Sequence, residues 1–208
     1  SNTLPVTGAA IQPRYNEGSC GDVFPAVGGP PRTSPCPDGF LVKLTRSGTV
    51  AYATYFGGTG WDEATAVAVD RTGAAVIAGL TRSVNLPTVR AVQPQCKPGF
   101  VPLPCGDAFV ARIDPAGASL VYSTYLGGTD AEGVSGVSVD ASGSAFVGGS
   151  ITGSGMPMLR SPQPVNGGGQ SDGYVVALAP AGELLWSTYV GGAAEEGIAG
   201  GGRAGGGV

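Results

Sequence analysis

Short apolar runs alternate with glycine- and proline-containing turns along almost the whole chain. The runs are rich in valine, alanine, isoleucine and aromatic residues, which is typical of β-strands. No helical periodicity appears, so the pattern predicts an all-β fold. The expected strands are residues 40–44, 50–56, 66–69, 75–78, 109–113, 122–126, 137–139, 145–147, 174–178 and 186–190.

One phrase occurs three times, as YATYFGG, YSTYLGG and WSTYVGG. The copies start at residues 52, 122 and 186, so they are 70 and then 64 residues apart. A phrase repeated at such an interval indicates a repeat architecture. Strand alternation sends Tyr122 and Leu126 to one face of a sheet and Tyr125 to the other. Both faces carry bulk, which a sheet packed between two neighbours requires.

Each period holds four short strands, tight turns and one long loop, as in the blades of a β-propeller. The chain resembles the bacterial SBBP-type β-propeller repeat. Its pattern runs Asp-x-Phe-Val-x-Lys-Leu, Pro-x-Gly, Tyr-Ser-Thr-Tyr-Leu-Gly-Gly and Val-Asp-x-x-Gly. Here it is carried by residues such as 107–113, 115–117, 122–128 and 137–143.

The resemblance implies an all-β fold made of four-stranded antiparallel propeller blades. We expect residues 1–58 to hold a disulfide loop and the two outer strands of one blade. Residues 59–128 and 129–192 form two further blades, and residues 193–208 form the frayed, glycine-rich start of another. A ring needs about four to eight blades. The chain is therefore expected to be an incomplete or open arc, a fragment whose remaining blades come from the full-length chain or from self-association.

The resemblance also implies a non-catalytic module of a bacterial secreted or cell-surface protein, and it brings no catalytic residues. Successive hairpins alternate ends, so the long loops and the Gly-Gly loops are expected to emerge on one face. We expect contacts with a protein or a glycan ligand on that face. The alternative is a glycan-directed hydrolase that uses acidic loop residues.

The amino-acid composition limits the classes of function and of binding partner that we expect. The 208 residues include no histidine, and lysine plus arginine number 11 without a basic run, at a net charge of −4. Histidine-dependent catalysis is excluded, and nucleic acid is not an expected partner. No apolar stretch is long enough to span a membrane as a helix. Neither a signal peptide nor an initiator methionine is visible at the start of the sequence.

The four cysteines lie two in each of two long loops. Cys36 and Cys105 each stand two residues before a strand-opening aspartate, and the simplest pairing is Cys20–Cys36 and Cys96–Cys105. A zinc site is the alternative, but the spacing lacks a Cys-x2–4-Cys knuckle. Disulfides predict an oxidising compartment, extracellular or at the cell surface.

Acidic residues recur in the loops. Aspartates 38, 107 and 172 open equivalent strands and aspartates 70 and 140 lie in equivalent turns, which favours a structural role. The Gly-Gly loops carry acidic clusters, and these are either solvated charges or ligands for a cation such as Ca²⁺. No other cofactor is expected. The candidate ligand or cation-binding residues are Trp61, Asp62, Glu63, Asp130, Glu132, Glu195 and Glu196.

Aromatic residues fall into two sets. Those that recur, such as Phe40, Phe109 and Tyr174, are expected in the core between blades. Those that do not recur lie in loops on the proposed binding face, where they either pack the loops or anchor a ligand. These are Trp61, Tyr15, Phe24 and Phe100.

Overall fold

The structure is a computed structural model that describes residues 4–16, 18–21, 33–97, 105–194 and 196. All regular elements in these residues are antiparallel β-strands, so the all-β prediction is confirmed. No helix in this part of the chain is long and apolar enough to cross a membrane. Several predictions concern residues outside the described ones. These are the loop aromatics Phe24 and Phe100, the candidate ligand Glu195, and residues 197–208 of the expected frayed segment.

Ten of the twelve described strands form three sheets. The first sheet pairs β3 (Gly39–Leu44) with β4 (Val50–Phe56). The second sheet has the order β5-β6-β7-β8, from β5 (Asp62–Val69), β6 (Ala75–Thr81), β7 (Ala108–Ile113) and β8 (Leu120–Leu126). The third sheet contains β9 (Glu132–Val139), β10 (Ala145–Ile151), β11 (Asp172–Leu178) and β12 (Leu184–Val190), paired in that order.

A small hairpin that the strand pattern did not predict precedes the first sheet. It pairs β1 (Ser19–Gly21) with β2 (Thr33–Pro35). The predicted starts of two further strands, each at one edge of its sheet, were also wrong. β5 begins at Asp62 and β9 at Glu132, rather than at Ala66 and Val137. Acidic residues at these starts obscured the strand signal in the sequence.

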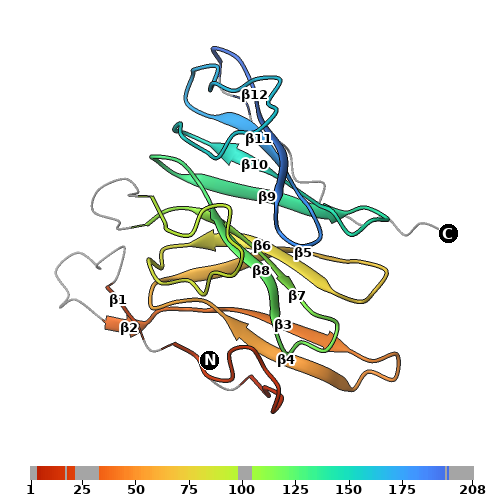
Figure 1. Ribbon diagram of the computed structural model, residues 1–208. Coiled ribbons are helices and arrows are strands. Elements are labelled where there is room, and N and C mark those ends of the chain that lie inside the picture. The colour runs from red at the N-terminus through yellow and green to blue at the C-terminus, as the bar shows by residue number, and fades with distance from the viewer. Residues whose placement is uncertain (1–3, 17, 22–32, 98–104, 195, 197–208) are drawn as a thin grey trace.

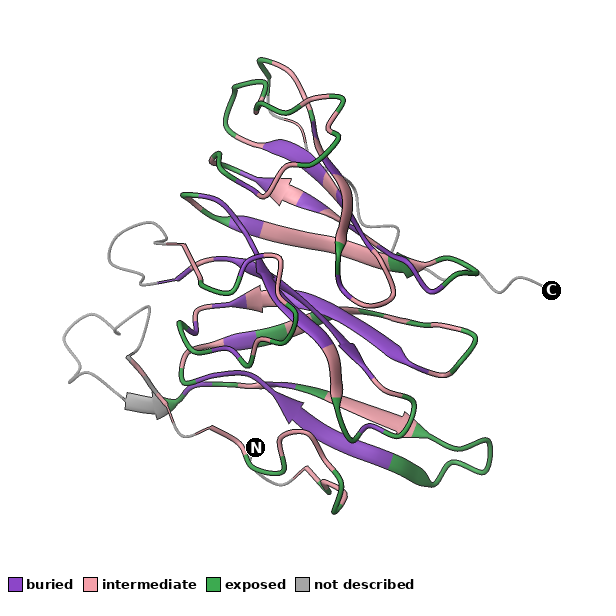
Figure 2. Cartoon of the chain, in the orientation of Figure 1, coloured by how far each residue is buried: buried purple, intermediate pink, exposed green. Residues whose placement is uncertain are grey.

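The three sheets stack face to face, with the first sheet at the bottom of Figure 1 and the third at the top. The two sides of the second sheet lie in different apolar clusters. Tyr125 and Phe109 belong to the cluster that includes Phe56 of the first sheet, whereas Tyr122 and Leu126 pack with strands of the third sheet. The alternation predicted for the repeated phrase is therefore correct. Figure 2 shows β7 buried along its length, as expected for a strand in a middle layer. No closed ring is present among the described residues.

Turns of one sheet press on tyrosines of the preceding one. Gly117, in the β7–β8 turn, has a φ of 74°, and a Cβ at this position would overlap the ring of Tyr52 in β4. Gly182, in the β11–β12 turn, has a φ of 103°. A Cβ at this position would lie 2.6 Å from the Cβ of Tyr122 in β8. Glycine suits both positions because it tolerates positive φ and close approach.

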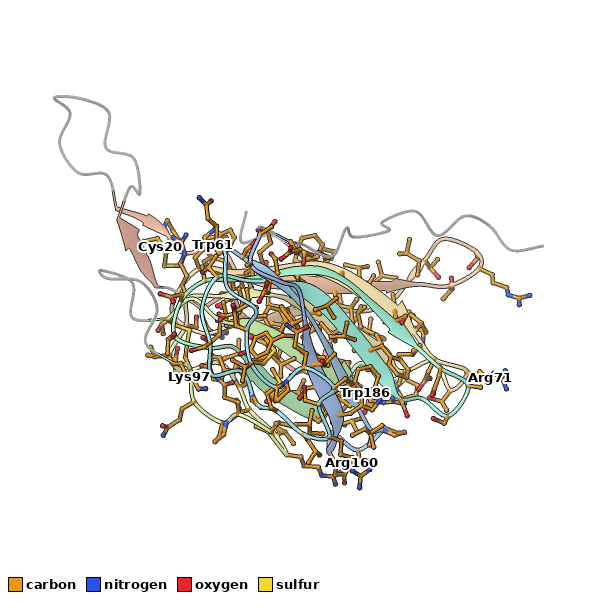
Figure 3. All side chains as sticks on the ribbon, turned by 90° about the horizontal axis from the view of Figure 1, so that it is seen from above. Cys20, Trp61, Arg71, Lys97, Arg160 and Trp186 are labelled. Atoms are coloured by element: carbon orange, nitrogen blue, oxygen red, sulfur yellow. A yellow bond between two sulfur atoms is a disulfide. The ribbon has the colours of Figure 1, made fainter. Side chains whose placement is uncertain are left out.

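The two ends of the sheets differ. The loop end carries residues 57–61, 82–97, 105–107, 127–131 and 152–171, and the turn end carries the tight hairpin turns. Figure 3 shows Trp61, Cys20 and Lys97 at one end and Arg71 at the other. Contacts such as that of the Gly60 N–H with Ser83 Oγ, 2.7 Å, bring the short and long loops together.

Candidate functional site

The repeated phrase binds the long loop of its own repeat at the loop end. In the second sheet, the backbone N–H of Gln93 donates to Thr124 Oγ1 (2.9 Å), and Gln93 Oε1 accepts from the N–H of Gly127 (3.1 Å). The first copy uses Gln12, Thr54 and Gly57, and the third uses Gln163, Thr188 and Gly191 in the same way. These recurring side chains are occupied inside the protein.

The tyrosine that follows the threonine of the phrase holds the start of the same loop. Its hydroxyl accepts the backbone N–H of Leu86 in the case of Tyr125, at 2.8 Å. Leu4 donates to Tyr55 (3.1 Å) and Met156 to Tyr189 (3.3 Å). The phrase thus fixes the long loop against the edge strand that carries it, which is a structural role.

The strand-opening aspartates accept backbone N–H groups from the long loops. Asp38 Oδ2 accepts from Asn16 (2.8 Å), Asp107 Oδ2 from Lys97 (3.1 Å), and Asp172 Oδ2 from the N–H of residue 167 (2.5 Å). The turn aspartates behave as Asx turns. Asp70 Oδ1, for example, accepts the N–H of residues 72 and 74. Both sets stabilise loops, as the sequence suggested.

Three of the acidic candidates accept hydrogen bonds from backbone N–H groups of the Gly-Gly loops. Asp62 Oδ2 accepts the N–H of Gly58 at 2.7 Å, Glu132 Oε1 that of Gly128 at 2.7 Å, and Glu196 Oε2 that of Gly192 at 2.9 Å. Asp62 also accepts the hydroxyls of Thr81 (2.5 Å) and Ser83 (2.7 Å). Asp62 and Glu132 are only 1% and 6% exposed, so the interpretation as solvated loop charges is wrong for both.

Each buried acid faces a strand-opening aspartate across the first glycine of the phrase. Asp38 Oδ1 and Asp62 Oδ2 both lie 2.7 Å from the position that a Cβ on Gly57 would take. In the next repeat, Asp107 and Glu132 form the corresponding pair. Asp38 Oδ1, Asp107 Oδ1 and Glu132 Oε2 are buried and accept no hydrogen bond from the described residues. A proton on one carboxyl of such a pair relieves the repulsion between two buried charges.

Burial raises the pKa values of these groups. Desolvation raises the pKa of Asp38 to about 6, against the hydrogen bond from Asn16, and the charge of Asp62 adds to it. Desolvation likewise raises the pKa of Asp107 to about 6. The pKa of Glu132 reaches about 8, first through burial and then through the neighbouring charges of Asp107 and Asp130.

The predicted acidic candidates do not meet at one point. Asp62 and Glu63 lie between the first and second sheets, Asp130 and Glu132 between the second and third, and Glu196 beyond the third. Glu63 is exposed and Asp130 partly so. The one group of three potential ligands in the described part of the chain is Cys96, Cys105 and Asp107.

The predicted cysteine pairing is confirmed by disulfides between Cys20 and Cys36 and between Cys96 and Cys105, with Cα–Cα distances of 4.9 and 5.8 Å. Both sulfurs beside Asp107 are therefore bonded to each other, which leaves no thiolate for zinc. Two disulfides are compatible with an oxidising, extracytoplasmic environment.

Phe40 departs from the aromatic prediction. Its counterparts Phe109 and Tyr174 are 0% exposed, as expected of core residues, but Phe40 is 59% exposed because no described sheet covers its face of the first sheet. A hollow of about 350 Å³ separates Phe40 from Trp61, and a second of about 520 Å³ lies between Phe40 and Tyr15. The exposure of Phe40 could not be predicted from its sequence context, because it depends on which sheets lie beside it in the described structure.

The non-recurring aromatics are half-buried at the loop end. Trp61 packs under the guanidinium of Arg82, whose Cζ lies 5.3 Å from the ring centroid. Tyr15 meets Tyr55 edge to face, at 5.9 Å between centroids. Both keep a partly exposed surface.

Comparisons with known protein families and with curated proteins find no match to this chain.

Proposed function

We propose that this chain is a non-catalytic, SBBP-type β-propeller repeat module that presents its loop end to a protein or glycan ligand. One observation carries the proposal. The recurring polar residues, such as Gln93, Thr124 and Tyr125, are occupied by bonds within the protein, whereas the residues that differ between repeats gather at the loop end. Variable residues on a repeated frame are the usual arrangement of a binding surface on a rigid scaffold.

The setting that we propose is a bacterial secreted or cell-surface protein. The two disulfides support it, because such bonds persist in oxidising compartments. The stacked four-stranded sheets support the propeller arrangement, in which further blades come from the rest of a longer chain or from self-association. Ligand contacts are assigned to Trp61, Glu63 and Asp130, which keep exposed surface at the loop end.

A hydrolase remains the second candidate because three carboxyls, those of Asp38, Asp62 and Glu63, line the hollow beside Trp61. The raised pKa of Asp38, about 6 through burial, is a property of general acids. The same arrangement of acids recurs between the second and third sheets, where Asp107 and Glu132 are buried. This recurrence favours a structural role for the pair.

A glycan array combined with a hydrolysis screen separates the candidates. We expect binding without turnover, and a loss of affinity of about tenfold or more in Trp61→Ala, as for aromatic anchors of binding sites. Trp186→Ala is the matched control, because this tryptophan lies away from Trp61 in Figure 3. Melting temperatures of both variants exclude unfolding as the cause.

Turnover that disappears in Asp38→Asn would establish the hydrolase instead. Absence of both binding and turnover, in the glycan array and in a screen of protein partners, would leave a spacer and overturn the binding proposal.

A further inference from the structure

The edge of β3 is unpaired in the described structure. β3 pairs with β4 alone, whereas its counterparts in the other sheets have neighbours on both sides: β7 lies between β6 and β8, and β11 between β10 and β12. Every second N–H and C=O group of β3 therefore points away from the sheet without a strand partner. Such an edge is a template for pairing with another strand.

The outer face of β5 is also uncovered. Val67 and Val69 are 57% and 59% exposed. Their counterparts in β9, Val137 and Val139, are partly buried against the core, because the β5–β6 hairpin packs against β9. A hollow of about 140 Å³ lies between β3 and β5, lined by residues that include Val42, Ala66 and Val67. Among the described residues, no two-stranded hairpin occupies this edge and face, whereas the β5–β6 hairpin pairs with β7 and packs against β9.

A charged side chain at the β3 edge also lacks the carboxylate partner that its counterpart has in the described structure. Arg112, in β7, binds the carbonyl of Gly143 in the next sheet and also the carboxylate of Asp70 in the hairpin turn of its own sheet. Lys43 is its counterpart in β3. It donates to the carbonyls of Gly73 (3.3 Å) and Pro115 (2.9 Å), but no described carboxylate lies within ion-pair distance. The position equivalent to Asp70 would lie in the turn of a hairpin paired with β3, which the described residues do not contain.

The register specifies a glycine. Gly79 lies opposite Phe109 and Gly149 opposite Tyr174. A Cβ on either glycine would overlap a backbone oxygen of the neighbouring inner strand, that of Glu63 or Gly133, where the pairing register shifts. A hairpin that pairs with β3 in this geometry therefore needs a glycine opposite Phe40.

We propose that the β3 edge and the Val67–Val69 face bind a β-hairpin of the same repeat type, supplied from outside the described residues. Its pairing strand carries a glycine opposite Phe40, and its turn carries an aspartate that contacts Lys43. This inference rests on the repeat scaffold of the proposed function and specifies a partner for it. Ala131, which is the counterpart of Trp61, remains exposed where β5–β6 covers β9, so hairpin docking leaves the Trp61 surface accessible.

The test adds a second copy of residues 62–82 directly before Ser1 of the full chain. This junction keeps the spacing of the repeat, because Ser1-Asn2-Thr3-Leu4-Pro5 corresponds to Ser83-Val84-Asn85-Leu86-Pro87. We expect amide hydrogen exchange in β3 to slow by about tenfold or more, as for strands that gain a pairing partner. The melting temperature should rise as well.

Matched variants test the two recognition elements. Gly79→Val in the added copy alone should restore fast exchange in β3. Lys43→Glu should weaken docking, and Asp70→Lys in the added copy should recover it, which a purely structural loss would not do. Docking that persists with Gly79→Val would contradict the register, and failure of the charge swap would contradict the contact with Lys43.

Three results would overturn the proposal: unchanged exchange in β3 when the hairpin is added, slow exchange in β3 of the unmodified monomer, or protection of β3 that appears only as the chain dimerises in sedimentation. The last result would assign the edge to a second copy. Ligand binding through Trp61 is measured separately, so failure of hairpin docking with retained ligand binding removes only this inference.

Discussion

Buried carboxyl groups determine how the stability of this protein depends on pH. Asp38 and Asp107 have pKa values raised by burial to about 6, and burial with nearby negative charge raises that of Glu132 to about 8. In the unfolded chain these groups titrate near pH 4. The folded state therefore binds their protons more tightly, so their contribution is complete below about pH 4 and is lost as the pH rises through 6 to 8.

Other aspartates act in the opposite direction. Although burial opposes it, hydrogen bonds from Thr72 and Ala74 and the charge of Arg112 lower the pKa of Asp70. Its contribution is lost as the pH falls below about 4. We therefore expect the melting temperature to be highest near pH 4–5 and to fall towards pH 8. Glu132→Gln should flatten the fall between pH 6 and 8. A melting temperature that rises from pH 5 to 8 would contradict the assignment.

At the scale of elements, the two disulfides support segments that differ in their attachment. Cys96–Cys105 holds the loop that gives the Lys97 N–H to Asp107, and Cys105 is buried against the second sheet. Cys20–Cys36 joins the β1–β2 hairpin, which makes no extensive strand contacts with the three sheets in the described residues. A crosslink raises global stability only if the segment it closes unfolds together with the core.

We predict that replacing Cys96 and Cys105 with serine lowers the free energy of unfolding by about 2.6 kcal/mol, the chain-entropy value for closing a loop of nine residues. The Cys20→Ser, Cys36→Ser variant should change it much less, although its loop is longer, and should mainly expose the hairpin to proteases. Chemical denaturation of both variants checks this. Equal losses would show that the hairpin unfolds with the sheets.

Most strands could be predicted from the sequence because alternation and turn residues are local signals. The ten strands of the three sheets, the turns and the faces of the Tyr122 phrase follow from them. The start of β5 at Asp62 could not, because a buried carboxylate is tolerated there only through donors such as Ser83, 21 residues away. The exposure of Phe40 depends on which sheets surround it, and its sequence context matches that of Phe109.

At the scale of the whole molecule, neighbouring sheets are joined at the turn end as well as through their apolar faces. Lys43 of the first sheet binds carbonyls of two turns in the second, and Arg112 of the second binds Gly143 in the third. Each sheet is thus tied to the next, but only the second sheet has a described neighbour on both faces. Stability should therefore be unequal along the stack.

We predict that native-state hydrogen exchange is slowest in the second sheet, intermediate in the third and fastest in the first. β7 is buried throughout its length and hydrogen-bonded on both edges, whereas β3 has one unpaired edge and mostly partly exposed side chains. Regions with fewer buried contacts have a lower free energy of opening, so their amides exchange faster. Exchange measured over a low range of denaturant gives the opening free energy of each strand, and identical values for β3, β7 and β11 would show a single cooperative unit.

Arg112→Met removes the hydrogen bond between the second and third sheets. This variant should bring the opening free energies of β11 closer to those of β3 while leaving those of β4 unchanged.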